Sequence, residues 1–130
     1  MSDFCLIVGE KELKVHKIIL GARSPYFKAM FSSENEENRK NLVEITDFEL
    51  EVIEALLKFL YTGKIPEMNE EFVRDLLRAT DYFQVEQLKS KCEDFLIGKL
   101  SVANAADTIL LADSCNSTKL KNKALEFVKK

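Results

Sequence analysis

The residue types that most often carry out chemistry are scarce in this chain of 130 residues. His16 is its one histidine, and Cys5, Cys92 and Cys115 are its three cysteines, all far apart in the sequence. A cysteine nucleophile needs a histidine base beside it, and no local motif marks such a pair here. Zinc typically takes about four ligands at spacings such as C-x-x-C, and these isolated residues lack that pattern. We therefore expect no catalytic residue and no metal site.

The remaining patterns also argue against an enzyme. Four scattered glycines form no phosphate-binding loop, and acidic stretches such as Glu36-Glu37 and residues 67–71 are typical of solvated charge or of helix N-termini. The net charge of −3 lacks the basic excess of a nucleic-acid-binding surface. No apolar run approaches the roughly 18 residues of a membrane span. We expect no enzyme activity, no cofactor, no nucleic-acid partner and no membrane segment.

His16 is better explained by structure than by chemistry. It lies where an alternating pattern ends and a helical one begins, directly before the apolar residues 18–20. A neutral imidazole can donate one hydrogen bond and accept another, so it can tie a strand end to a helix start. Asp3 and Arg23 are the polar partners nearest in sequence. We interpret Asp3, His16 and Arg23 as a polar structural junction.

The elements around this junction follow from hydrophobic periodicity. Residues 3–15 alternate on both sides of a turn at residues 9–12, which predicts a β-hairpin, and residues 41–46 predict a short third strand. The later segments have helical periodicity. A small three-stranded sheet followed by a majority of helices indicates the α+β class. Three widely spaced cysteines are typical of reduced thiols, so we expect the nucleus or the cytoplasm.

Capping residues and glycines mark the helix ends. Ser24 followed by Pro25 predicts that the stretch HKIILGARSPYFKAMF forms two short helices, with the second starting at the proline. Gly63 predicts a left-handed residue at a helix C-terminus. Further helix starts are predicted by a capping box at residues 46–49, by Asn69, by Ser101 with Val102 on the buried stripe, and near Thr118.

A weak internal repeat with a spacing of 32 residues links two parts of the C-terminal half. Its members are Asp81, Leu88, Lys89, Lys91 and Phe95, which recur as Asp113, Leu120, Lys121, Lys123 and Phe127, with Leu77 and Leu96 matching Ile109 and Val128. The repeat predicts two helical hairpins stacked in series, each with one face on its neighbour and one face left for a cap or a partner. We expect a domain at residues 1–98 and a helical extension at 99–130.

The sequence resembles the BTB/POZ domain on an ordered set of short motifs. The set comprises Asp3, Leu6, Val8, His16-Lys17, Leu20, Ala22-Arg23-Ser24-Pro25, Phe27, Met30-Phe31, Val43-Glu44-Ile45, Asp47, residues 59–63, Leu76-Leu77, Ala79, residues 81–83, Leu88 and Cys92-Glu93. The tail at residues 100–106 and 110–113 is similar to the speckle-type POZ proteins, the MATH–BTB subgroup. The likeness covers nearly the whole chain.

This resemblance implies a protein-interaction module. Many BTB domains bind the scaffold cullin three and act as substrate adaptors of a RING E3 ubiquitin ligase, through a φ-x-E motif (φ is apolar) and a helical extension, the three-box. The extension at residues 99–130 stands where the three-box would lie. The implied function is therefore a cullin-three adaptor. The alternative is a self-association or scaffolding domain without cullin binding.

The resemblance also assigns the cullin-binding residues, which are Phe31, Asn35, Glu37, Asp81, Tyr82, Phe83 and Ile109. Glu37 stands at the Glu of the φ-x-E motif, whereas Asn35 stands at the apolar position, where an amide would lose roughly 1–3 kcal/mol of contact energy. The aromatic members are equally explained as core side chains, and Glu37 as a solvated surface charge.

Two further expectations concern partners. Dimeric BTB proteins usually carry a helix before the first strand, and here a strand begins near Asp3. We therefore expect at most a weak homodimer. The substrate-binding MATH domain is not in this sequence, so substrates would be bound by a domain outside it.

Overall fold

The computed structural model describes residues 2–129, which divide into two compact units. The first unit extends to Pro66 and includes Phe83–Val85, and the second comprises Glu67–Tyr82 and the chain from Glu86 onward. Within the described residues, no helix is both long and apolar enough to cross a membrane. The α+β class predicted from the sequence is confirmed. The predicted boundary between residues 98 and 99 stays a prediction.

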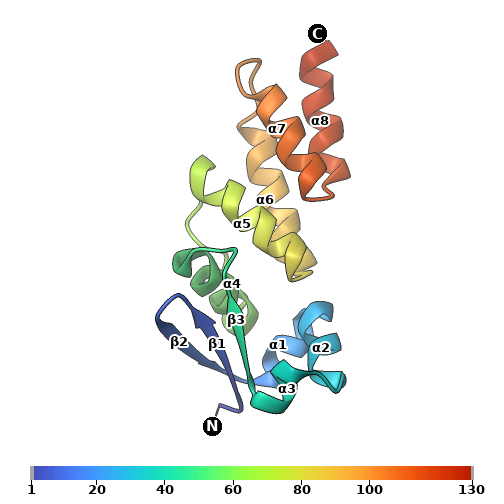
Figure 1. Ribbon diagram of the computed structural model, residues 1–130. Helices are drawn as coiled ribbons and strands as arrows, with labels where there is room; N and C mark the ends of the chain where they lie inside the picture. The colour runs from blue at the N-terminus through green and yellow to red at the C-terminus, as the bar shows by residue number, and fades with distance from the viewer. Residues whose placement is uncertain (1, 130) are drawn as a thin grey trace. The chain divides into compact units, whose positions relative to one another are not determined.

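The first unit is built on a three-stranded sheet in the order β2-β1-β3 (Figure 1). Strand β1 (Phe4–Val8) pairs antiparallel with β2 (Lys11–Val15) and parallel with β3 (Leu42–Ile45). The hairpin turn is only Gly9-Glu10, shorter than predicted, because Gly9 adopts a φ of 63°. Alternate residues of β1 are buried, so the central strand supplies the apolar face of the sheet.

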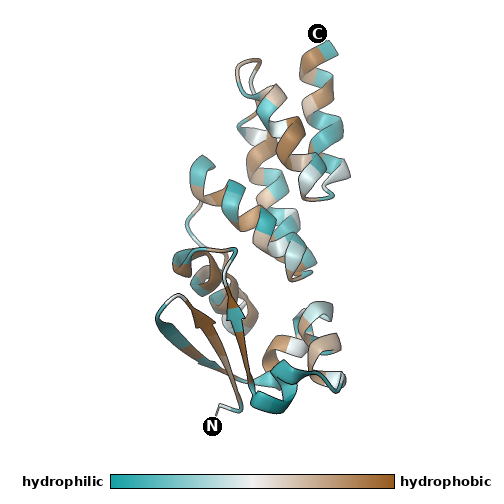
Figure 2. Ribbon diagram, viewed as in Figure 1, coloured by the Kyte–Doolittle hydropathy of each residue, from teal (hydrophilic) through white to brown (hydrophobic). Residues whose placement is uncertain are grey.

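Four helices complete the first unit. They are α1 (Lys17–Arg23), α2 (Pro25–Ser32), α3 (Glu36–Lys40) and α4 (Leu50–Thr62). The predicted break at Ser24 is confirmed, since the Ser24 side chain accepts a hydrogen bond from the Phe27 N–H (3.2 Å). The predicted end of α4 is also confirmed, with Gly63 at a φ of 75°. Figure 2 shows that β1 is strongly hydrophobic, whereas α3 is hydrophilic.

The predicted capping box at residues 46–49 is wrong. Helix α4 begins at Leu50, and Glu49 occupies the N-cap position without a side-chain hydrogen bond to the helix. Phe48 lies in a bend, with its ring 5.6 Å from the Phe83 ring. The contact of this half-buried ring with Phe83 holds the chain out of the helical conformation that a start at Thr46 requires.

The second unit consists of two helical hairpins, as the 32-residue repeat predicts. Helices α5 (Glu70–Tyr82) and α6 (Glu86–Gly98) form the first hairpin, and α7 (Ala105–Ser114) and α8 (Thr118–Lys129) form the second hairpin. Asn69 accepts a hydrogen bond from the Phe72 N–H (2.9 Å), which confirms the predicted cap of α5.

The predicted start of the following helix at Ser101 is wrong. Helix α7 begins four residues later, at Ala105, and Val102 is exposed and not part of a buried stripe. Ser101 and Asn104 instead bond to each other across a turn: the Ser101 N–H donates to Asn104 Oδ1 (2.8 Å) and the Asn104 N–H donates to Ser101 Oγ (3.3 Å). Local side-chain bonds of this kind compete with helix formation.

Candidate functional site

Helix α2 is fixed to the core of the first unit by stacked aromatic rings. The Phe27 ring stacks on Phe83 (centroids 5.3 Å apart) and on Phe31 (5.8 Å). Ser24 Oγ also donates to the Phe83 carbonyl (2.6 Å), so the residue that caps α2 ties it to the Phe83 segment. This rigid base determines where α2 ends and therefore where the residues after it are placed.

Phe31 lies at the C-terminal end of α2 and is half-buried. Its ring makes an edge contact with Phe4 (centroids 4.9 Å apart), and the Lys17 ammonium lies 5.7 Å from its centroid. The same ammonium donates to Asn38 Oδ1 (2.8 Å). Phe31 is thus partly a core residue, and its remaining exposed surface is what a partner could contact.

A short helix that sequence reasoning missed follows directly. In α3, Asn35 is the N-cap, and its Oδ1 accepts from the Asn38 N–H (2.7 Å) while its Nδ2 donates to the Met30 carbonyl (3.0 Å). Asn41 ends the helix in the left-handed conformation. The signal is present in the sequence: an asparagine cap, two glutamates in the first turn, two basic residues in the last turn and a terminal asparagine.

The structure therefore gives Asn35 and Glu37 different surroundings. Both polar groups of the Asn35 amide are used within the α2–α3 segment, and the side chain is only partly exposed. Glu37 is exposed in the first turn of α3. Phe83 is 1% exposed, so it can act on a partner only by positioning its neighbours. Contact of these residues with a cullin stays a prediction.

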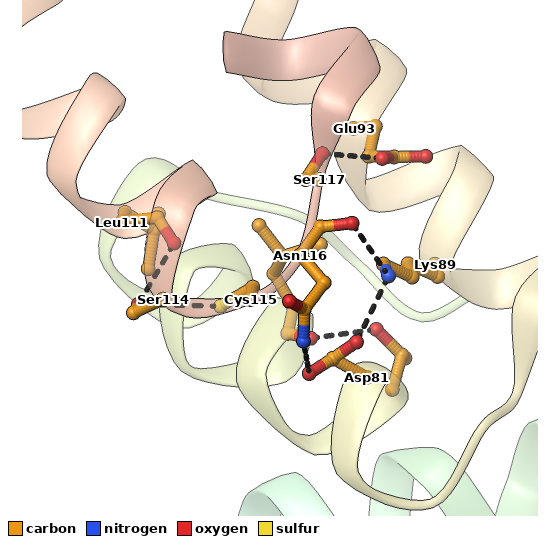
Figure 3. A network of polar contacts seen from close by, with 10 residues as sticks. Asp81, Lys89, Glu93, Leu111, Ser114, Cys115, Asn116 and Ser117 are labelled. Atoms are coloured by element: carbon orange, nitrogen blue, oxygen red, sulfur yellow. Dashed lines mark hydrogen bonds and ion pairs between the residues drawn. The ribbon is translucent and has the colours of Figure 1, made fainter.

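The remaining assigned residues lie in the second unit. Asp81 and Tyr82 end α5, and the half-buried Ile109 lies in the middle of α7. The Asp81 carboxylate is engaged inside the unit, since Oδ1 accepts from the Lys89 ammonium (3.0 Å) and Oδ2 accepts from the Asn116 amide (3.3 Å), as Figure 3 shows. Asp81 is therefore a structural acceptor, whereas Tyr82 is exposed.

The junction around His16 exists, but its partners differ from those predicted. The His16 backbone N–H donates to the Tyr61 hydroxyl (2.8 Å), and His16 Nδ1 lies 3.0 Å from the same oxygen. Asp3 accepts from the Lys17 N–H (2.8 Å), and Arg23 donates to the Phe59 carbonyl (3.3 Å). Each of the three residues holds an end of α1, but none pairs with another, and Tyr61 lies too far along the chain to have been inferred.

Burial disfavours the reactive thiolate form of Cys92 and Cys115. All three are free thiols, and burial raises the pKa of Cys115 and raises that of Cys92 to about 12. A thiol needs a depressed pKa to act as a nucleophile at neutral pH. Within residues 2–129, no group of three His, Cys, Asp or Glu side chains could hold a metal ion.

Comparisons with known proteins agree with this geometry. The family model for the BTB/POZ domain matches residues 1–100. TD and POZ domain-containing protein 3 of Mus musculus is 45% identical over 128 residues, which are 98% of this chain and 35% of that protein. The chain thus spans about a third of the length of this curated relative.

Two solved structures resemble the fold. The BTB domain of zebrafish PATZ1 matches with a TM-score of 0.64 at 27% identity, over 73% of this chain and 75% of that one. The BTB domain of human Gigaxonin matches with a TM-score of 0.63 at 26% identity, over 72% of this chain and 76% of that one. The chain belongs to the BTB/POZ domain family, whose members are protein–protein interaction modules.

Proposed function

We propose that this chain is the cullin-three-binding module of a substrate adaptor for a RING E3 ubiquitin ligase. The observation that carries the proposal is the end of α2, where Phe31 leads into a capped helix with Glu37 exposed in its first turn. A charge held on a rigid helical turn suits recognition of a partner's surface.

Asn35 sets the expected strength of this interaction. The amide replaces an apolar anchor and is held by two hydrogen bonds within its own segment, so it offers a partner little apolar contact. The same two bonds stabilise α3, which positions Glu37. We infer that Asn35 stabilises α3 but gives up the apolar contact with cullin three that a residue such as methionine would make. The affinity of the chain for cullin three should therefore be low.

Calorimetric titration of a cullin-three N-terminal domain into the chain tests the proposal. Glu37→Ala should weaken binding several-fold, because it removes the exposed charge, whereas Glu34→Ala, another exposed glutamate before α3, should leave binding unchanged. Absence of binding heat at tens of micromolar protein would contradict the proposal.

A second pair of variants isolates the anchor. Asn35→Met and Asn35→Ala both remove the cap, at about 1 kcal/mol of stability, but only methionine restores an apolar side chain. We expect Asn35→Met to bind the cullin domain at least about fivefold more tightly than Asn35→Ala. Equal affinities would show that this position is not an anchor.

Self-association without cullin binding is the second candidate. The observation in its favour is Ile18, which is 83% exposed on α1. Contact of this side chain with a second copy of the chain would be favourable, because it would remove apolar area from water. Light scattering on the chain distinguishes the two candidates. Under the cullin proposal we expect a largely monomeric species with at most a weak dimer. A stable dimer that does not bind the cullin domain would favour self-association.

The substrate and the compartment belong to the same proposal. Substrates would be recruited by a domain outside this chain, consistent with a relative of roughly three times its length. Three free cysteines support a reducing compartment, the nucleus or the cytoplasm. Antibody staining of the tagged full-length protein tests this, and a secreted product would contradict it.

A further inference from the structure

The 32-residue repeat extends to backbone detail. Helix α6 begins at Glu86 and α8 at Thr118, and α5 ends at Tyr82 and α7 at Ser114, so both helix boundaries at each turn keep the 32-residue spacing. Gln84 and Asn116, also 32 residues apart, both adopt the left-handed conformation, with φ of 57° and 55°. Each turn is therefore built in the same way.

The two hairpins also contain the same ion pair. Lys89 Nζ lies 3.0 Å from Asp81 Oδ1 in the first hairpin, and Lys121 Nζ lies 2.9 Å from Asp113 Oδ1 in the second. Their burial is very different. The Lys89 and Asp81 side chains are 8% and 25% exposed, whereas those of Lys121 and Asp113 are 40% and 69% exposed.

The difference arises from the turn of the second hairpin, which lies over the first ion pair (Figure 3). The Asn116 carbonyl accepts from the Lys89 ammonium (3.5 Å), and the Asn116 amide donates to Asp81 Oδ2 (3.3 Å). Beside it, the Ser117 hydroxyl donates to the buried Glu93 carboxylate. Asn116, in the turn between two helices, thus supplies a hydrogen-bond partner to both members of the ion pair.

The apolar residues follow the same pattern. Helix α6 contacts α8, and Leu96 on α6 is buried. The counterpart of Leu96 in the repeat, Val128, is 59% exposed. Leu77 is buried and its counterpart Ile109 only half-buried. By contrast, Arg78 and its counterpart Leu110 are both exposed. We call Ile109, Asp113, Lys121 and Val128 the open stacking face.

We propose that the open stacking face binds a further helix–turn–helix unit, whose turn donates an amide N–H to Asp113 and presents a backbone carbonyl to Lys121. Hydrogen-bonding and charge complementarity select this occupant, because Asn116 already fills the same role on the matching pair within this chain. Helical repeats stack by such repeated interfaces. The inference does not depend on cullin binding, and its test leaves Ile109 unchanged.

The test appends a second copy of residues 99–130 directly after residue 130, which preserves the 32-residue spacing. The chain's own second hairpin is then the probe, since it is the unit that covers the first ion pair. Hydrogen exchange of the α8 backbone amides, followed by mass spectrometry, should slow at least about tenfold relative to the unextended chain. Unchanged exchange in α8 would overturn the proposal.

Matched variants show whether the hairpin is seated on this face. Val128→Asp in the original copy should abolish the slowing, whereas Leu110→Asp, also at an exposed apolar residue but outside the face, should preserve it. Alanine in place of the asparagine in the added turn should reduce the slowing several-fold. These variants leave the original turn intact, so the unextended chains should keep their helical circular dichroism. Equal effects of the two aspartate variants would overturn the proposal.

Discussion

Each hairpin of the second unit contains an ion pair at the equivalent position, and the two pairs differ in burial. Asp81–Lys89 and Asp113–Lys121 have the same spacing and nearly the same length, but only the first is covered by a turn that supplies its remaining hydrogen bonds. Exposed pairs contribute little because water and salt compete for both charges. Removal of one member of a buried ion pair leaves the charge of the other member uncompensated. The comparison shows that the contribution of each ion pair to stability depends on its burial and not on its N···O distance, which is nearly the same in both pairs.

Removal of the buried ammonium should have the largest effect. Lys89→Ala leaves Asp81 and the Asn116 carbonyl without their shared donor, and we expect a loss of about 3 kcal/mol of unfolding free energy. Urea denaturation followed by circular dichroism measures it. Lys91→Ala, at an exposed position of the same helix, is the control and should change stability by less than about 0.5 kcal/mol. A loss of similar size in both variants would remove the basis of the comparison.

The hydrogen bond beside this pair should come next. Ser117→Ala removes the donor to the Glu93 carboxylate, a group 9% exposed, and we expect a loss of about 1–3 kcal/mol. Ser114→Ala is a matched control, because that hydroxyl bonds only locally, to the Leu111 carbonyl and the Cys115 thiol. Chemical denaturation of the two variants should therefore separate them clearly, and equal midpoints would contradict a structural role for the Ser117–Glu93 bond.

Cys92 gives the comparison a pH dependence. Its counterpart in the repeat is Ala124, so Cys92→Ala places the second hairpin's residue in the first. Burial raises the Cys92 pKa from 9.0 to about 12, so the unfolded chain ionises first and stability falls as the pH rises from about 9 toward 12. The fall should approach 1.4 kcal/mol per pH unit. Denaturation of both chains at pH 8 to 11 should show a shallower fall for Cys92→Ala, and parallel curves would contradict it.

Local signals in the sequence were sufficient for much of this fold. The hairpin strands, the caps at Ser24 and Asn69, the stop at Gly63 and the paired hairpins all follow from short-range patterns. Long-range features did not. The parallel pairing of β1 with β3 and the Tyr61 partner of His16 join residues far apart in sequence, where side-chain chemistry alone selects no partner.

The candidate site shows the same division. Helix α3 was not predicted although its capping residues are present in the sequence, because its five residues include no buried residue and so show no hydrophobic periodicity. The hydrogen bonds from Lys89 and Asn116 to Asp81 could be predicted only in part from the sequence. The repeat places Asp81 and Lys89 in the same register as Asp113 and Lys121, but their different exposures come from tertiary packing.

The smallest effect should come from the exposed pair. Lys121→Ala should cost less than about 0.5 kcal/mol, and this difference should disappear between about 0.1 M and 1 M salt, because both side chains are solvated and screened. Denaturation at the two ionic strengths measures it, with Lys123→Ala as the control for an exposed lysine of the same helix. A loss as large as that of Lys89→Ala would mean that the pair is already covered. In the chain extended by residues 99–130, the same substitution should become more destabilising, since an added turn would bury the pair as Asn116 buries its counterpart.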